Sequence, residues 1–134
     1  MEITDLTGWE PTLLDAPRLP DSLPDNYAPN VLRSSFVVPG SIVVYGFVFY
    51  STNASAQYLN VFDASALPAD GAVPLWSWNL PANQGVGVAY QPNGRWFKSG
   101  LVLCNSSTDA TKTIGSADCL ADVQFNMLNP ISRG

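Results

Sequence analysis

Residues Ser41–Tyr50 read SIVVYGFVFY, and this stretch decides the fold. It is filled with β-branched and aromatic residues, carries no charge and has the length of a strand. Regular alternation would make both faces apolar, with Ile42, Val44 and Val48 on one and Val43, Tyr45, Phe47 and Phe49 on the other. We therefore expect both faces to be covered, one of them by something other than the strand's own sheet. Gly46 predicts a bulge or a close backbone approach.

Similar short strands follow outward from this stretch, separated by turn residues such as Pro39-Gly40 and Asp70-Gly71. No segment has apolar residues at a helical period over three turns. The strands are expected at Ser35–Val38, Gln57–Phe62, Leu75–Leu80, Gly85–Tyr90, Arg95–Phe97, Leu101–Cys104 and Leu120–Met127. The sequence predicts an all-β fold, an antiparallel β-sandwich of jelly-roll or Greek-key type.

The first 34 residues differ in composition from the rest. Closely spaced prolines at 11, 17, 20, 24 and 29 exclude regular helix and central strand, so residues 1–34 are expected to form an extended arm and residues 35–134 the sandwich. The arm is too apolar for a solvated tail, and its anchors would bind its own sandwich or a neighbouring subunit. These candidate partner-binding residues are Trp9, Leu13, Leu14, Leu19, Leu23 and Tyr27. The alternative is a loose terminus with incidental apolar residues.

The charge balance narrows the choice of partners. Six Lys and Arg against eleven Asp and Glu give a net charge of −5, and no basic stripe occurs, so we expect no binding to nucleic acid. Charged residues make up 13%, which indicates either a Ser/Asn-rich surface or one buried in an assembly. The start, Met1–Asp5, is acidic and no long apolar run follows, so we expect no signal peptide and no membrane span.

The residues needed for catalysis are scarce. Histidine is absent, which removes the usual base of a Ser or Cys nucleophile, and two cysteines cannot form a zinc site alone. The acids of the sandwich fall mostly in loops, where Asp usually makes turns. We expect no enzyme activity, no cofactor and no metal. Cys104 and Cys119 are expected to be reduced.

Three tryptophans have two interpretations. Trp76, Trp78 and Trp96 are a possible exposed aromatic platform on which a sugar ring stacks. The interpretation we favour is that they are core or interface residues. In Leu75–Leu80, alternation places Trp76, Trp78 and Leu80 on one face of a strand.

Several segments resemble small proteins encoded among the structural genes of tailed bacteriophages. They are Ser51–Asp63 (STNASAQYLNVFD), Leu67–Pro74 (LPADGAVP), Gly100–Thr108 (GLVLCNSST) and Lys112–Cys119 (KTIGSADC). The resemblance covers about residues 41–126 and leaves the proline-rich arm outside.

The resemblance implies a capsid cement or decoration protein. Such a jelly-roll module binds the outer surface of the head shell as a homodimer or homotrimer and ties neighbouring copies of the major capsid protein together. It would be located in the virion and assembled in the host cytoplasm. The family has no catalytic motif, so no site residue is carried over. The alternatives are a receptor- or glycan-binding module of a head or tail fibre, and a minor tail or baseplate adaptor.

Overall fold

The computed structural model describes residues 24–128. Within this range the secondary structure consists of strands, and no helix long and apolar enough to cross a membrane is found there. The strands are β1 (Asp25–Tyr27), β2 (Ser35–Pro39), β3 (Ile42–Ser51), β4 (Gln57–Asp63), β5 (Trp76–Leu80), β6 (Gly85–Ala89), β7 (Arg95–Phe97), β8 (Gly100–Ser106) and β9 (Cys119–Met127). The predicted strands from residue 35 onward are all present, and β1 is one that the sequence did not predict.

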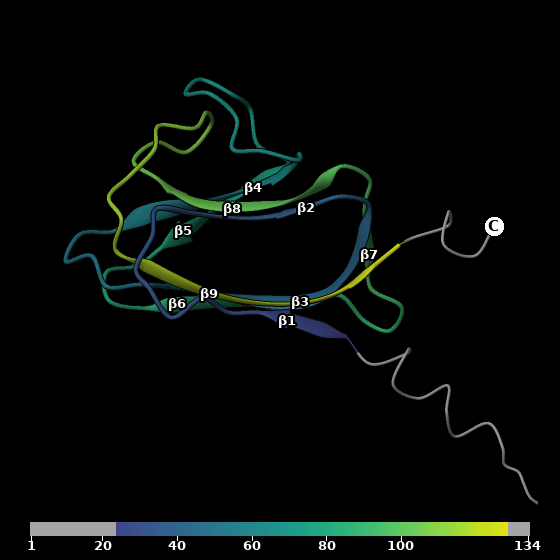
Figure 1. Ribbon diagram of the computed structural model, residues 1–134. Helices are drawn as coiled ribbons and strands as arrows, with labels where there is room; N and C mark the ends of the chain where they lie inside the picture. The colour runs from purple at the N-terminus through teal and green to yellow at the C-terminus, as the bar shows by residue number, and fades with distance from the viewer. Residues whose placement is uncertain (1–23, 129–134) are drawn as a thin grey trace, which may run out of the picture.

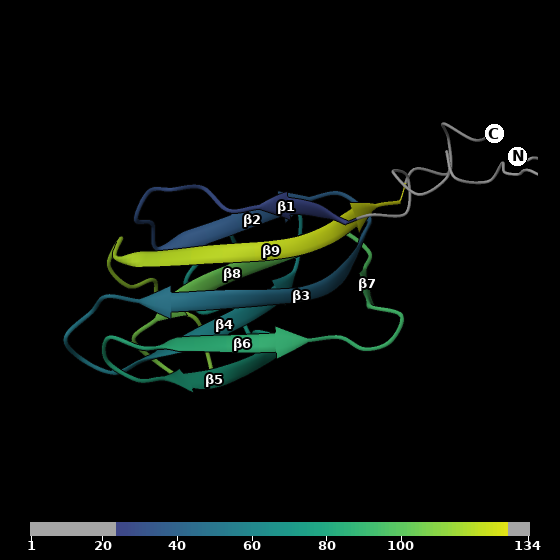
Figure 2. The same cartoon turned by 90° about the horizontal axis from the view of Figure 1, so that it is seen from below.

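The strands form two antiparallel sheets that pack face to face, as Figure 1 shows edge-on. In the first sheet the order is β1-β9-β3-β6, and β7 pairs with β3 beside β6. In the second sheet the order is β2-β8-β4-β5. Figure 2 shows the first sheet from its outer side, with β1 at one edge and β6 at the other. The predicted all-β sandwich is therefore confirmed.

A bulge in β3 changes the face that each side chain occupies. Val44 lies opposite Phe125 and Gly46 lies opposite Gln124, so Tyr45 is an extra residue in β3. Beyond the bulge Phe47 and Phe49 point inward, whereas Val48 is 51% exposed. The predicted grouping of Ile42, Val44 and Val48 on one face was wrong, because regular alternation ignores the extra residue. The bulge expected at Gly46 is present.

The core lies between the sheets. The larger cluster contains Phe36, Ile42, Val44, Phe47, Phe49, Leu59, Leu101, Leu103 and Val123, among others. Phe36 and Phe49 meet edge to face, with ring centroids 5.8 Å apart. The inward side chains of both sheets thus interdigitate as sandwich packing requires.

The outer face of the second sheet is covered by the protein's own loops. β8 is buried at all 7 positions, and a second apolar cluster of Phe62, Val102 and Cys104 packs against Ala72 and Ile114 from those loops. Two backbone hydrogen bonds join the loops: Gly71 N–H donates to Lys112 O at 2.7 Å, and Lys112 N–H donates to Ala72 O at 2.8 Å. The loop that follows β4 and the loop that follows β8 therefore form a fixed cover over this sheet.

The Lys112 side chain strengthens this cover. This side chain is 2% exposed, and its ammonium group forms an ion pair with Asp70. Asp70 also accepts a hydrogen bond from Ile114 N–H at 3.1 Å. The hydrogen bond from Lys112 holds the pKa of the Asp70 carboxyl below its ordinary value. A buried lysine needs such a partner, since an unpaired ammonium in the interior is costly.

Candidate binding surface

Within residues 24–128, no loop covers the outer face of the first sheet in the way described for the second. Strand registers place Val43, Val48, Tyr50, Trp96, Leu120, Asp122, Gln124, Asn126, Asn26, Gly85, Gly87 and Ala89 on this face. Among these outward strand residues Asp122 alone is charged. Trp96 is 58% exposed, Val48 51% and Tyr50 39%. Exposed aromatic and aliphatic groups with little charge are typical of the centre of a protein interface.

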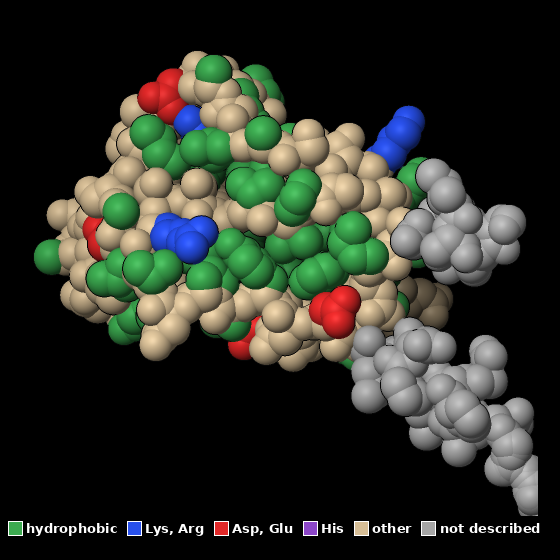
Figure 3. Space-filling model, in the orientation of Figure 1, with side chains coloured by type: hydrophobic (Ala, Val, Ile, Leu, Met, Phe, Trp, Pro, Cys, Tyr) green, Lys and Arg blue, Asp and Glu red, His purple; other side chains and the backbone are tan. Residues whose placement is uncertain are grey.

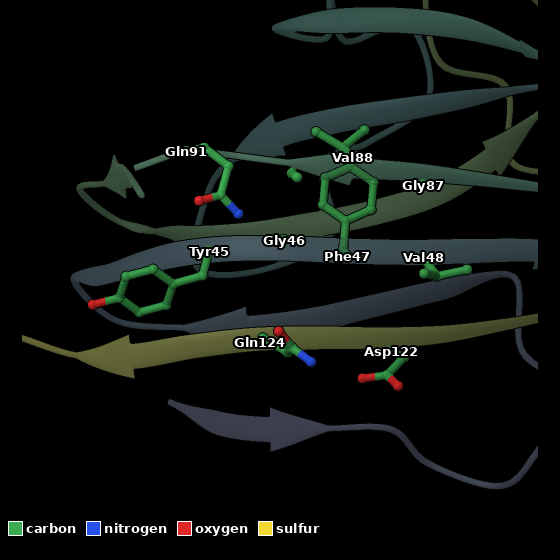
Figure 4. Close-up of a pocket in the computed structure, with 10 residues that line it drawn as sticks. Tyr45, Gly46, Phe47, Val48, Gly87, Val88, Gln91, Asp122 and Gln124 are labelled. Atoms are coloured by element: carbon green, nitrogen blue, oxygen red, sulfur yellow. The ribbon is translucent and has the colours of Figure 1, made fainter. Parts of the chain in front are cut away.

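A groove runs along this face because one edge strand carries nothing larger than a methyl group there. Gly85, Gly87 and Ala89 of β6 lie on the outer face, and Gly46, which follows the extra residue Tyr45 in β3, lies opposite Ala89. The resulting hollow has a volume of about 380 Å³. Figure 4 shows Tyr45 toward one end, Asp122 and Val48 toward the other, and Gln124 between them.

Polar groups line the groove alongside Tyr45. The side chains of Gln91, Asp122 and Gln124 make no hydrogen bond to the described residues, so they can bind a ligand without breaking a contact. The hydroxyl of Tyr45 is held, since it accepts a hydrogen bond from Asn126 Nδ2 at 3.3 Å. The groove therefore offers an aromatic wall, amide groups and one carboxylate.

Trp76 and Trp78 do not form an exposed platform with Trp96. Both are half-buried and face the core, with ring centroids 5.3 Å apart. They pack with Phe47, Tyr90 and Phe97, and the Arg95 guanidinium lies 5.0 Å from the centre of the Trp76 ring. Trp96 lies on the outer face of the other sheet, where its Nε1–H donates to Ser41 Oγ at 2.8 Å.

The predicted arm lies largely outside the described residues. Trp9, Leu13, Leu14, Leu19 and Leu23 all fall there. Tyr27 is described: it belongs to β1, lies opposite Val123 and packs against the core cluster while half-buried. Its hydroxyl accepts a hydrogen bond from Arg33 at 3.4 Å.

Other apolar side chains are exposed away from the first sheet. Leu67, Val73 and Leu75 lie in the loop between β4 and β5, and Val73 is 76% exposed. On the side shown in Figure 3, hydrophobic side chains gather along the seam between the two sheets and charged side chains are few. The described surface thus has several apolar areas, of which the first sheet's outer face is the one built on regular strands.

Two of the acids have structural roles, and both thiols are buried. Asp63 accepts hydrogen bonds from the backbone N–H groups of Lys98, Ser99 and Gly100, and Asp118 accepts one from Asn53 Nδ2 at 2.8 Å. Burial raises the pKa of Cys104 and of Cys119 to about 12, so neither is a ready nucleophile. In residues 24–128 no three His, Cys, Asp or Glu side chains gather as a metal site.

Comparison with known proteins gives little further information. No family model matches the chain, and no curated protein matches it. One solved structure that is similar is the coat protein of tobacco streak virus, at 9% sequence identity and a TM-score of 0.36. The similarity covers 77% of this chain and 87% of that chain. A likeness at this identity and TM-score carries no argument about family or function.

Proposed function

We propose that this chain is a structural virion protein, a capsid cement or decoration module that binds the head shell of a tailed bacteriophage through protein–protein contacts. The observation that carries the proposal is the outer face of the first sheet. It exposes Trp96, Val48 and Tyr50 and has Asp122 as its charged strand residue, and none of the described loops covers it as loops cover the second sheet. A large, weakly charged sheet face is suited to burial against a protein partner.

The strand pairing supports a jelly roll. β1 pairs with β9, β2 with β8, β3 with β6 and β7, and β4 with β5. β6 and β7 pair with successive parts of β3, so they act as one interrupted strand. The pairs are nested, as in a long antiparallel hairpin that is rolled into two sheets. Nested pairing of this kind is expected of a jelly roll, so it supports that part of the proposal.

In this proposal the partners are the major capsid protein and further copies of this chain, on the outer surface of the virion after assembly in the host cytoplasm. The part of the arm before β1 would extend contacts to a neighbouring subunit through the apolar anchors Trp9, Leu13, Leu14, Leu19 and Leu23. Repetition over the shell lattice would let weak contacts add up. No enzyme activity is proposed.

The first test is the copy number in purified particles, measured by quantitative mass spectrometry against the major capsid protein. Hundreds of copies in a fixed ratio to the shell subunit are expected of a cement protein. A dozen copies or fewer would contradict it and indicate a fibre or tail component.

The second test maps the contact by adding purified protein to undecorated shells. Val48→Asp places a charge on the outer face and is expected to lower binding at least tenfold. Val73→Asp is the matched control, because Val73 is also an exposed valine but lies in the loop between β4 and β5. Equal binding by both variants and the wild type would exclude this face as the shell contact.

The groove favours a second candidate function, the binding of a glycan by a head or tail fibre module. Tyr45 lines the groove, and Gln91, Asp122 and Gln124 offer hydrogen-bonding groups without partners among the described residues. On a panel of immobilised neutral and acidic oligosaccharides, Asp122→Asn is expected to lose binding, while Trp96→Ala, outside the groove, keeps it. Absence of binding to every oligosaccharide tested would remove this candidate.

A further inference from the structure

β6 is an edge strand whose second side meets no other strand of residues 24–128. Its five residues, Gly-Val-Gly-Val-Ala, pair with β3 alone among the described strands. An open edge leaves a row of N–H and C=O groups available to another strand. Figure 2 shows β6 at the free border of the first sheet.

The register identifies which backbone groups point outward. The Ser51 N–H donates to Gln84 O just before β6, and the Tyr90 N–H donates to Tyr45 O just after it, both at 2.9 Å. Because hydrogen-bonded and non-hydrogen-bonded pairs alternate in an antiparallel ladder, the residues of β6 that bond β3 are Val86 and Val88. The N–H and C=O groups of Gly85, Gly87 and Ala89 therefore point away from β3.

β6 also lacks the features that normally protect an edge. It contains no charged residue, no proline and no side chain larger than valine. The other edge strands differ: β1 is three residues long and starts with Asp25, β2 ends at Pro39, and β5 carries the bulky Trp76 and Trp78. β7, which lies on the same side of β3, carries Arg95 and Trp96. Among the described edge strands, β6 therefore allows the closest approach of another backbone.

We propose that two copies of this chain pair through β6, antiparallel and about a twofold axis at Gly87, to form one continuous sheet. In this register Gly87 faces Gly87 of the second copy, and Gly85 faces Ala89 at both ends. Every outward backbone group of these three residues then finds a partner. A patch that is complementary to itself is what a twofold contact requires.

A second copy suits this edge better than another occupant does. Each chain has a net charge of −5, so two copies must meet where charge is absent, and β6 is such a segment. The pairing would place the two outer faces side by side, doubling the surface described above. The dimer itself does not depend on the proposed function. Only its use on a capsid shell rests on that function.

The test is sedimentation velocity of the full chain from 1 to 200 μM. The wild type is expected to shift from the mass of one chain to twice that mass. Gly87→Lys is expected to stay monomeric, because two lysines would face each other across the axis. Gly87→Ala is the matched control and should still dimerise, since a Cβ at Gly87 meets no atom closer than 3.9 Å.

A second variant separates loss of pairing from loss of folding. Ala89→Pro removes an outward N–H and leaves the bonds to β3, so it should be monomeric with an unchanged circular dichroism spectrum. A wild type that is monomeric throughout, a trimer, or a Gly87→Lys variant that still dimerises would overturn the inference. Shell binding is scored separately: a dimer that ignores shells refutes the proposed function, and a monomer that decorates them refutes the dimer.

Discussion

The carbonyl oxygen of Val88 lies 2.9 Å from the position that a Cβ atom on Gly46 would occupy. The β3 bulge and β6 approach each other this closely because Gly46 has no side chain. Gly46→Ala is expected to destabilise the fold by about 1–3 kcal/mol, since the neighbouring atom is backbone and cannot move aside. Urea denaturation measures this loss. Gly87→Ala is the control, expected within about 0.5 kcal/mol of the wild type. Equal stability of the two variants would refute the close approach.

Neighbouring residues of β3 should respond very differently to truncation. Phe47 is 3% exposed and packs in the core, so Phe47→Ala should cost about 3–5 kcal/mol. Val48 is 51% exposed, so Val48→Ala should change stability by no more than about 0.5 kcal/mol. Thermal and urea unfolding of both variants give the comparison. Similar losses in both would mean that the bulge does not set the faces as described.

The ion pair between Lys112 and Asp70 predicts that the stability of the fold depends on pH. In the folded chain the pKa of Asp70 lies below its ordinary value of 3.8. The ion pair therefore stabilises the fold fully at pH values above that ordinary pKa. This contribution is lost as the pH falls through the lowered pKa. Asp70→Asn should lower the melting temperature at pH 7 and flatten its fall in acid. Asp109→Asn, a change at an exposed aspartate near the same lysine in sequence, should do neither. Identical melting curves for wild type and Asp70→Asn would contradict this role.

The two thiols should be unreactive in the folded protein. Cys104 and Cys119 are fully buried, and burial raises the pKa of each to about 12. Ellman's reagent at pH 8 is expected to label neither thiol in buffer and both in 8 M urea, because the thiolate is the reacting form. Rapid labelling of a chain that is still folded by circular dichroism would show that these sites open to solvent.

The sequence predicts the strands well because their signals are local. From β2 to β9 each strand begins and ends within about three residues of its prediction. β1 was missed because Asp25–Tyr27 is three residues long, flanked by prolines, and forms a strand only through pairing with Val123–Phe125 of β9. Such a pairing depends on distant sequence.

The candidate surface was harder to predict for the same reason. The groove exists because the outward glycines of β6 lie beside the β3 bulge, and no local pattern states that β3 and β6 pair. The placement of Trp76, Trp78 and Leu80 on one face of a strand followed from alternation and is confirmed, and that face points toward the core. Their separation from Trp96 could not be read from the sequence, since it depends on which sheet each strand joins.

Because the strand pairs are nested, the two ends of the sandwich, here called its poles, differ from each other. Asp25 lies opposite Phe125, so the described chain enters and leaves at the same pole. At the other pole, Thr52 and Asn53 bond to Asp118 and Asn83 and tie three turns together. The described chain therefore begins and ends on one side of the domain, while the compact turns lie on the opposite side. A substitution in those turns would be far from the two ends of residues 24–128 and would test the opposite side of the domain separately.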